Sequence, residues 1–319
     1  MVGAVGQLAL VAEVLEDLGH GAEDRGGDGL APVGLVDDRA GEDDVLGQQR
    51  DGGLHVAGLD CLTKRAHGYP PQVRTRTARI ATLTRMFSPE GPSLRELAVQ
   101  ALSSVEHGYD LLAPKFDHTP FRTPDSVLDA TVEALKGMGP YGDGLDLCCG
   151  TGAGLGVLGE VCGSVTGVDF SAGMLERAKG QGARLVRADA RALPFTAAFD
   201  LVVSFGAFGH FLPGELPGLF RQVHTALRPG GTFAFPVGAP PKASTPAYWA
   251  LLGFDGAMRV RNALWRPPFV MYYRTFRLAD VRRELERAGF AVSLRALPEF
   301  GTRDDGSPRA RLIVGHKPA

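Results

Sequence analysis

A glycine-rich loop that directly follows a short apolar stretch constrains this chain more than any other feature. Residues 145–154 read Leu-Asp-Leu-Cys-Cys-Gly-Thr-Gly-Ala-Gly. Glycines in such a loop let the backbone pass close to a ligand above the carboxyl ends of parallel strands. The loop therefore predicts an α/β fold with a doubly wound sheet, and a ligand site at the carboxyl ends of its strands.

Alternating apolar and helix-forming stretches on both sides of the loop predict the elements of that fold. Strands are expected near 144–148, 164–169, 184–188, 199–204, 231–237, 290–297 and 309–316. A helix is expected over 93–114, followed by a loop from Ala113 to Pro124 and a helix that starts at Thr123-Pro124-Asp125 and runs to Gly137. Further helices are expected near 153–161, 172–180, 214–228 and 277–289.

The beginning of the chain differs from the rest in composition. Its first 68 residues contain no Phe, Trp, Tyr or Ile, so they offer little large apolar surface to offset the entropy cost of ordering. We expect 1–85 to be a disordered or non-native extension, with Met86 as the native start, or alternatively a regulatory or targeting extension. Residues 86–140 are expected to form a helical N-terminal lid, and 141–319 the ligand-binding domain, with a lid insertion at 238–276.

Composition disfavours several classes of partner and site. The formal net charge is −2 and no block of Lys and Arg occurs, so no nucleic-acid partner is expected. The four cysteines include no Cys-x-x-Cys pair, and no His/Cys cluster has zinc spacing, so no metal site is expected. No apolar run is long enough to span a bilayer and no signal peptide is recognised, which predicts a cytoplasmic protein.

Three acidic residues lie in or directly after successive expected strands, at the edge where the ligand site should lie. Asp146 precedes the glycines, where an acid disfavours a pyrophosphate and suits a ligand with an ammonium group. Asp169 ends the next strand, where an acid can accept two ribose hydroxyls, and Asp189 ends the third, where an acid can accept an adenine amino group. Each also has a structural alternative: a tie to the loop backbone, a helix cap or a turn residue. Three acids at successive strand ends favour a ligand site.

These residues resemble the class I S-adenosylmethionine (SAM)-dependent methyltransferases, with the nearest similarity to the small-molecule branch that includes quinone-biosynthesis-type enzymes. The resemblance covers roughly 105–319 and rests on 145–154, Val168-Asp-Phe-Ser171, Ala188-Asp-Ala190, Phe199-Asp-Leu-Val-Val-Ser204 and Leu227-Arg-Pro-Gly-Gly231. It implies a Rossmann-like, doubly wound, seven-stranded sheet whose last strand is antiparallel. A helical N-terminal segment and an aromatic-rich lid insertion would accompany the sheet.

The resemblance also implies which residues bind SAM. The methionine end would lie on Asp146 and Gly150 to Gly152, the ribose on Asp169, and the adenine near Asp189. The full implied cofactor set is Asp146, Cys149, Gly150, Thr151, Gly152, Asp169, Phe170, Met174, Asp189, Ala190, Ser204 and Phe205. A segment that includes Tyr109, Phe116, Asp117 and His118 would fold over the cofactor.

The methyl acceptor would lie beyond the fourth strand. His210 follows that strand and is the candidate general base; the alternative is a histidine that only holds its loop in place. Ser204-Phe205-Gly206-Ala207 replaces the Asn/Asp-Pro-Pro-Tyr signature of enzymes that methylate nucleic-acid bases and protein amides. A small aromatic or apolar acceptor is expected instead. Its candidate contacts are Tyr109, Phe116, Phe208, Trp249, Trp265 and Tyr272. For the aromatic residues of the lid insertion, the alternative is a cap with a small core of its own.

Two other functions remain open at this point. One is an NAD(P)-dependent oxidoreductase on a similar sheet, which Leu155 and Asp146 disfavour because the dinucleotide loop requires Gly-x-Gly-x-x-Gly. The other is a SAM-binding protein without methyl-transfer activity. The sequence predicts neither the acceptor nor the oligomeric state.

Overall fold

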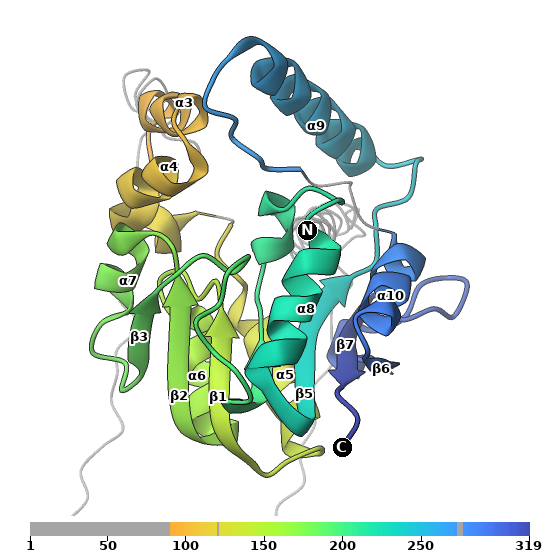
Figure 1. The fold of residues 1–319 in the computed structure, drawn as a ribbon. Helices are drawn as coiled ribbons and strands as arrows, with labels where there is room; N and C mark the ends of the chain where they lie inside the picture. The colour runs from red at the N-terminus through yellow and green to blue at the C-terminus, as the bar shows by residue number, and fades with distance from the viewer. Residues whose placement is uncertain (1–89, 120, 273–276) are drawn as a thin grey trace, which may run out of the picture.

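The computed structural model of the 319-residue chain describes residues 90–119, 121–272 and 277–319. Predictions made for residues 1–85 lie outside the described residues. Seven strands form one sheet in the order β3-β2-β1-β4-β5-β7-β6 (Figure 1). The strands are β1 (Tyr141–Leu147), β2 (Cys162–Asp169), β3 (Arg184–Arg187), β4 (Phe199–Val203), β5 (Leu227–Gly238), β6 (Ala291–Ala296) and β7 (Ala310–His316).

The sheet has the predicted doubly wound topology. β1 pairs in parallel with both β2 and β4, so the strand order reverses between these two neighbours. β7 runs antiparallel to β5 and to β6, which confirms the antiparallel last strand. A reversal of strand order opens a crevice at the carboxyl ends of the strands, and ligands of α/β sheets bind there.

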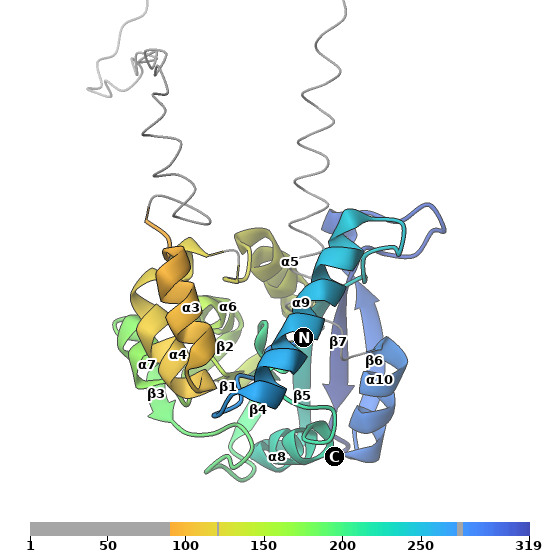
Figure 2. The same cartoon turned by 90° about the horizontal axis from the view of Figure 1, so that it is seen from above.

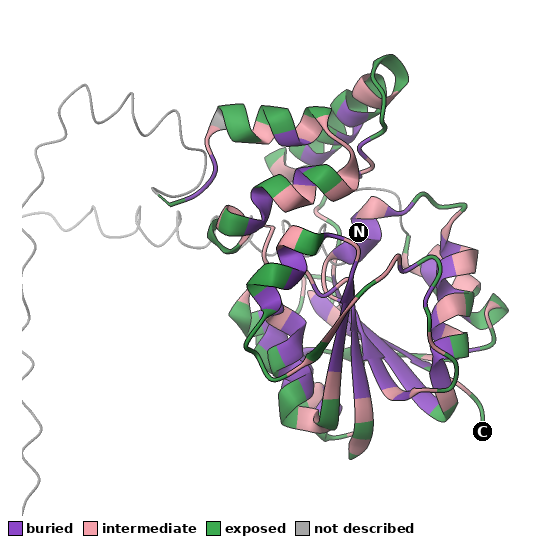
Figure 3. Cartoon of the chain, turned by 60° about the vertical axis from the view of Figure 1, so that its left-hand side comes forward, coloured by how far each residue is buried: buried purple, intermediate pink, exposed green. Residues whose placement is uncertain are grey.

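Helices cover both faces of the sheet. The helices are α3 (Leu94–Leu102), α4 (Val105–Leu112), α5 (Asp125–Lys136), α6 (Ala153–Val161), α7 (Ala172–Ala178), α8 (Leu216–Ala226), α9 (Pro246–Leu264) and α10 (Leu278–Arg287). Short 3₁₀ helices are η1 (Ala113–His118), η2 (Ala207–His210) and η3 (Pro298–Phe300). In β4, Leu201 packs with the core of α5 and α6, whereas the adjacent Val202 packs with the core of α8 and α10. This alternation is what a strand buried on both faces requires, and Figure 3 shows the sheet as the most buried layer.

The predicted single helix over 93–114 is wrong in one respect: it is broken into α3 and α4. Ser103 is extended at the end of α3, and the side chain of Ser104 accepts a hydrogen bond from the backbone N–H of His107, which caps α4. Serine favours such caps over helix interiors because its hydroxyl competes for backbone groups. The loop predicted from Ala113 also differs, since η1 continues directly from α4.

The fifth strand begins earlier than predicted, at Leu227 instead of 231. Leu227 pairs with Phe199, and the register between β4 and β5 then shifts before Leu201 pairs with Thr232. Gly230 has a φ of +77° inside this irregular stretch, a conformation that favours glycine. The turn-like residues Arg-Pro-Gly-Gly therefore belong to a bulged strand start and not to a separate turn.

A layer of helices lies above the carboxyl ends of the strands. Figure 1 shows α3, α4 and α9 on that side, and Figure 2 shows them from above. α9 lies within the segment that we expected to be a lid insertion, and α3 and α4 lie within the expected N-terminal lid. Within the ranges described, no helix combines the length and apolar character that a membrane span needs.

Candidate functional site

The glycine-rich loop connects β1 to α6 at the crevice. Gly152 has a φ of +99°, and a Cβ there would lie 2.5 Å from the side chain of Gln181. A Cβ at Gly154 would lie 2.5 Å from Oδ2 of Asp146 and 2.6 Å from the ring of Phe205. Gly152 thus meets a conformational requirement, and Gly154 permits the close approach of α6 to the end of β1.

Asp146 is buried beside this loop without a partner. Its side chain is 1% exposed, and neither carboxylate oxygen accepts a hydrogen bond from any described residue. Burial, followed by the nearby charge of Asp169, holds its pKa well above the usual range of an aspartic acid. Because a buried polar group without a partner costs free energy, this carboxylate suits a ligand that brings a cation or several donors. The position therefore fits the ammonium group of the methionine end of SAM.

Asp169, at the end of β2, ties the loop to the next helix. Its Oδ2 accepts the backbone N–H of Gly150 at 2.9 Å, and its Oδ1 accepts that of Ser171 at 2.9 Å. Burial raises its pKa, and these backbone bonds oppose the rise. The alternative considered for Asp169 was a helix cap, but Ser171 caps α7, and Asp169 instead ties down the loop backbone. A carboxylate oxygen has a second lone pair, so the same oxygens can still accept ribose hydroxyls.

Asp189 follows β3 and is paired with Arg191. The guanidinium of Arg191 donates to both carboxylate oxygens of Asp189, at 2.7 Å in the shortest contact, and also contacts Glu215 at 2.9 Å. Burial favours the neutral acid, but the bonds from Arg191 outweigh it and lower the pKa of Asp189. Arg191 was not predicted from the sequence, and no motif marks it beyond its place two residues after the acid.

One cavity of about 500 Å³ unites these groups. Such a volume lies within the range of about 300–1,000 Å³ that is typical of small-molecule sites. Ten of the implied cofactor residues line it: Asp146, Cys149, Gly150, Thr151, Asp169, Phe170, Met174, Asp189, Ala190 and Phe205. Gly152 and Ser204 do not line it. Ser204 is buried instead and donates from its hydroxyl to the carbonyl oxygen of Leu147, which joins the ends of β4 and β1.

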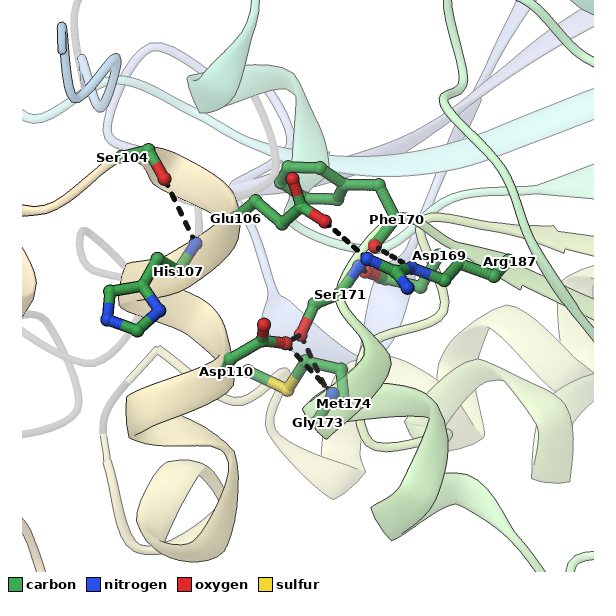
Figure 4. Close-up of polar contacts among 10 residues, drawn as sticks. All are labelled: Ser104, Glu106, His107, Asp110, Asp169, Phe170, Ser171, Gly173, Met174 and Arg187. Carbon is green, nitrogen blue, oxygen red and sulfur yellow. Dashed lines mark hydrogen bonds and ion pairs between the residues drawn. The ribbon is translucent and has the colours of Figure 1, made fainter.

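The N-terminal segment is fastened over the cofactor side of the cavity. Asp110 Oδ1 accepts the hydroxyl of Ser171 at 2.6 Å and the backbone N–H of Gly173 at 2.9 Å, both at the start of α7 (Figure 4). Glu106, also on α4, pairs with Arg187 at 2.6 Å. An acid at a helix N-terminus accepts hydrogen bonds from N–H groups that have no partner within the helix, and its negative charge interacts favourably with the helix dipole. The contacts of Asp110 hold α4 against the start of α7, and that of Glu106 holds it against the end of β3.

A second fastening joins η1 to the loop itself. The hydroxyl of Thr151 donates to Oδ1 of Asp117 at 2.6 Å. Thr151 is 6% exposed, so this bond lies at the covered edge of the loop. Asp117 belongs to the segment that the family resemblance implied would fold over the cofactor, and the structure brings this residue to the loop.

Comparison with known proteins agrees with this geometry. A family model described as a methyltransferase domain matches residues 145–231. An uncharacterized methyltransferase of Synechocystis sp. is 40% identical over 181 residues, which cover 53% of this chain and 76% of that protein. The chain belongs to the class I SAM-dependent methyltransferases. SAM is its cofactor, and the nicotinamide-dependent alternative is not favoured.

Two further similarities are more limited. A demethylmenaquinone methyltransferase of Staphylococcus epidermidis is 32% identical over 152 residues, which cover 44% of this chain and 60% of that enzyme. A solved structure described as a DhpI–SAH complex matches with a TM-score of 0.50 at 19% identity, covering 71% of this chain and 99% of that one. The second similarity supports the fold alone.

The acceptor side of this methyltransferase differs from the expectation. Of the six predicted contacts, only Tyr109 and Phe116 line the cavity. Trp249 and Trp265, on and just after α9, are 61% and 52% exposed and do not line it. Clustering of aromatic residues in a segment predicts neither the face of a helix on which they lie nor the direction in which they point.

Phe208 and Tyr272 are also outside the cavity, because they are core residues. The ring of Phe208 packs against Phe235 at 4.7 Å between centroids, and Tyr272 bonds to the side chain of Asn262 at 2.8 Å. The acceptor side is lined instead by residues that the sequence analysis did not single out: Phe121, Phe211, Leu212, Pro268, Val270 and Met271. Most are ordinary apolar residues in irregular segments, which carry no periodic signal.

Proposed function

We propose that this methyltransferase transfers the methyl group of SAM to a small aromatic or apolar molecule. The observation that carries the proposal is the shared cavity, whose cofactor-side acids and acceptor-side aromatic and aliphatic residues face one space of about 500 Å³. Small-molecule sites combine a mainly apolar wall with a few placed polar groups. The acceptor wall has this character, with Phe116, Phe121, Phe211 and Met271 around Tyr109 and His210.

The cofactor would be held by residues of the sheet edge. Asp146 would accept hydrogen bonds from the ammonium group, Asp169 would accept them from the ribose hydroxyls, and Phe170 and Met174 would contact the adenine. SAM supplies a methyl group on a sulfonium whose leaving group is neutral, so the protein must mainly align the acceptor and exclude water. The N-terminal segment of α4 and η1 (residues 105–118), which we call the covering segment, would help to exclude water from the cavity. It is held in place by the bond between Asp110 and Ser171.

The relative from Staphylococcus epidermidis supports a quinone-like acceptor, because its name is demethylmenaquinone methyltransferase. This chain spans 60% of that enzyme's length, so the substrate is proposed only at the level of a planar, apolar ring system. The residues Ser204-Phe205-Gly206-Ala207 after β4, which replace the amide-methylating signature, support the same class.

The test has a binding arm and a turnover arm. Calorimetry should detect S-adenosylhomocysteine but not NAD, and NAD binding without S-adenosylhomocysteine binding would overturn the assignment. Transfer of labelled methyl from SAM is then measured with 2-naphthol, 1,4-dihydroxynaphthalene, catechol and, as a polar comparison, glycine. Turnover of the ring compounds alone supports the proposal. Binding of S-adenosylhomocysteine with no turnover of any ring compound would contradict it, and turnover of glycine alone would exclude an apolar acceptor.

A further inference from the structure

Tyr109 and His210 form a hydrogen-bonded pair on the cavity wall. The two residues are 101 positions apart, yet the Oη of Tyr109 lies 2.7 Å from Nε2 of His210. The rings meet edge to face at 88°, with centroids 5.0 Å apart. Both residues line the same cavity as Asp146 and Asp169. The pair therefore joins α4 of the covering segment to η2, which follows β4.

A third group determines the direction of this hydrogen bond. The Nδ1 of His210 lies 2.8 Å from the carbonyl oxygen of Val270. A carbonyl oxygen can only accept, so Nδ1 carries the hydrogen, and the neutral ring presents the lone pair of Nε2. Tyr109 must then donate its hydroxyl hydrogen to Nε2. His210 has no nitrogen left for the acceptor, whereas the oxygen of Tyr109 keeps its lone pairs.

We propose that Tyr109 receives the proton of the methyl acceptor and passes its own proton to His210, so that the two residues act as a relay. This inference rests on the proposed function and specifies its substrate class: the acceptor atom carries a proton that must leave, as in a hydroxyl group. The general base expected at His210 therefore acts through Tyr109 and does not contact the acceptor. Tyr109 is the catalytic residue, and His210 positions it and accepts its proton.

The step balances for a hydroxyl acceptor. The acceptor oxygen bonds to the methyl carbon while the carbon–sulfur bond breaks and leaves its electron pair on sulfur. The acceptor proton moves to Oη of Tyr109 as the phenolic proton of Tyr109 moves to Nε2 of His210. The products are a methyl ether, S-adenosylhomocysteine and an imidazolium, which returns its proton to solvent when the site opens.

The ionisation of the pair agrees with a relay and disagrees with a phenolate base. Burial, followed by the charge of Asp169, raises the pKa of Tyr109, so its hydroxyl stays protonated at neutral pH. Burial lowers the pKa of His210 to about 4, so its ring is neutral and can accept a proton. A protonated tyrosine can take a proton only if it gives one away, and His210 is the group that it touches.

The first test is turnover by Tyr109→Phe, with 2-naphthol as the acceptor. We expect kcat to fall by about 10²-fold or more, as for loss of a general base, with unchanged affinity for S-adenosylhomocysteine. Raising the pH should restore the rate, because ionised naphthol needs no base. Asp169, Cys148 and His210, the titratable groups beside Tyr109, are present in both proteins, so they affect both pH profiles alike. Tyr141→Phe, at the far end of β1, is the matched control and should keep wild-type kcat.

His210→Asn is the second variant, because its amide can keep the bond to Val270 while it removes Nε2. It should lose kcat like Tyr109→Phe, and circular dichroism reports whether either variant is folded. A readout independent of activity is the ¹⁵N spectrum of His210 in the protein without SAM. We expect the neutral tautomer with hydrogen on Nδ1, and an Nε2 signal that shifts in Tyr109→Phe.

The outcomes separate the two proposals. Wild-type kcat in either folded variant would overturn the relay while the proposed function stands. A ¹⁵N spectrum that shows the His210 tautomer with hydrogen on Nε2 would also overturn the relay and leave the proposed function standing, whatever the activity of the variants. Binding of S-adenosylhomocysteine without methyl transfer to any acceptor would overturn the proposed function, and the relay with it.

Discussion

Replacing Asp146 with asparagine should change stability and cofactor affinity in opposite directions. The side chain is 1% exposed and its carboxylate has no partner among the described residues. In the protein without cofactor, the unfolded chain ionises this acid freely, whereas the folded state must either protonate it or bury its charge. Asparagine has the same size without that penalty. Asp146→Asn should therefore stabilise the protein without cofactor.

The magnitude has an upper and a lower bound. Holding an acid of reference pKa 3.8 protonated at pH 7 costs at most about 4 kcal/mol, at 1.36 kcal/mol per unit. The lower bound is zero, because the amide of asparagine is as buried and unpaired as the carboxyl group, so the cost of an unsatisfied polar group remains. Because the folded pKa is raised, the contribution of Asp146 to stability is fully present below pH 3.8 and is lost as the pH rises. The gain of Asp146→Asn should thus be up to about 4 kcal/mol at pH 7 and disappear near pH 4.

The affinity of Asp146→Asn for S-adenosylhomocysteine should fall. A charged hydrogen bond contributes about 1.5–3 kcal/mol, which corresponds to a roughly 10- to 100-fold weaker Kd. Urea denaturation by circular dichroism measures the stability, and calorimetry with S-adenosylhomocysteine, which keeps the ammonium but lacks the sulfonium, measures the affinity. Asp143→Asn is the control on the same strand. It removes a half-exposed pair with Arg228 at 2.8 Å, so only a small loss of stability and no change in affinity is expected.

A variant that loses stability and binds S-adenosylhomocysteine as tightly as the wild type would refute this reasoning. That result would mean that Asp146 is a structural tie with a partner in solution. A loss of affinity without a gain in stability would show that the carboxylate is already satisfied before the cofactor binds, and would refute the stability argument alone.

Three further predictions concern the same site. Gly154→Ala should cost about 1–3 kcal/mol of stability and weaken S-adenosylhomocysteine binding in calorimetry, because its Cβ would lie 2.5 Å from Asp146 Oδ2; Gly156→Ala, with nothing within 4 Å, should do neither. Asp110→Ala should cost about 1–3 kcal/mol and speed amide hydrogen exchange in α4, and unchanged exchange would contradict the fastening described above. In the wild type, the free energy of unfolding should fall as the pH is lowered from 6.5 to about 4, because His210 becomes protonated in the unfolded chain first. In His210→Asn this fall should be smaller by about 1–3 kcal/mol. A histidine with a lowered folded pKa contributes stability above pH 6.5 that is lost as the pH falls, so an unchanged slope would show that His210 charges freely.

The sheet could be predicted from sequence because its signals are local. Apolar runs mark the strands, and the glycine-rich loop with Asp146 and Asp169 marks their carboxyl ends. The predictions were wrong where two local preferences of the same residues opposed each other. The pair Ser103-Ser104 looked like part of a long helix, but one serine ends α3 and the other caps α4.

The acceptor side could not be predicted in the same way, because it depends on tertiary contacts. Trp249 lies on the exposed face of α9, while Met271, in an irregular segment, lines the cavity. Nothing in the local pattern distinguishes the two positions. The contact of Tyr109 with His210 likewise joins segments 101 residues apart, and no spacing rule relates them.

The cofactor side and the acceptor side of the site differ in what holds their residues in place. This difference explains why the cofactor side could be predicted from the sequence and the acceptor side could not. On the cofactor side, Gly152 is required by a backbone angle, and Asp169 bonds to two backbone N–H groups. Few residue types satisfy such backbone constraints, so the residues that do can be recognised in the sequence. On the acceptor side, Phe211 and Met271 contribute only apolar surface, which many residues could replace. Tyr109 and His210 are the exceptions on that side, because only groups that donate and accept in the right order complete the chain to the Val270 carbonyl.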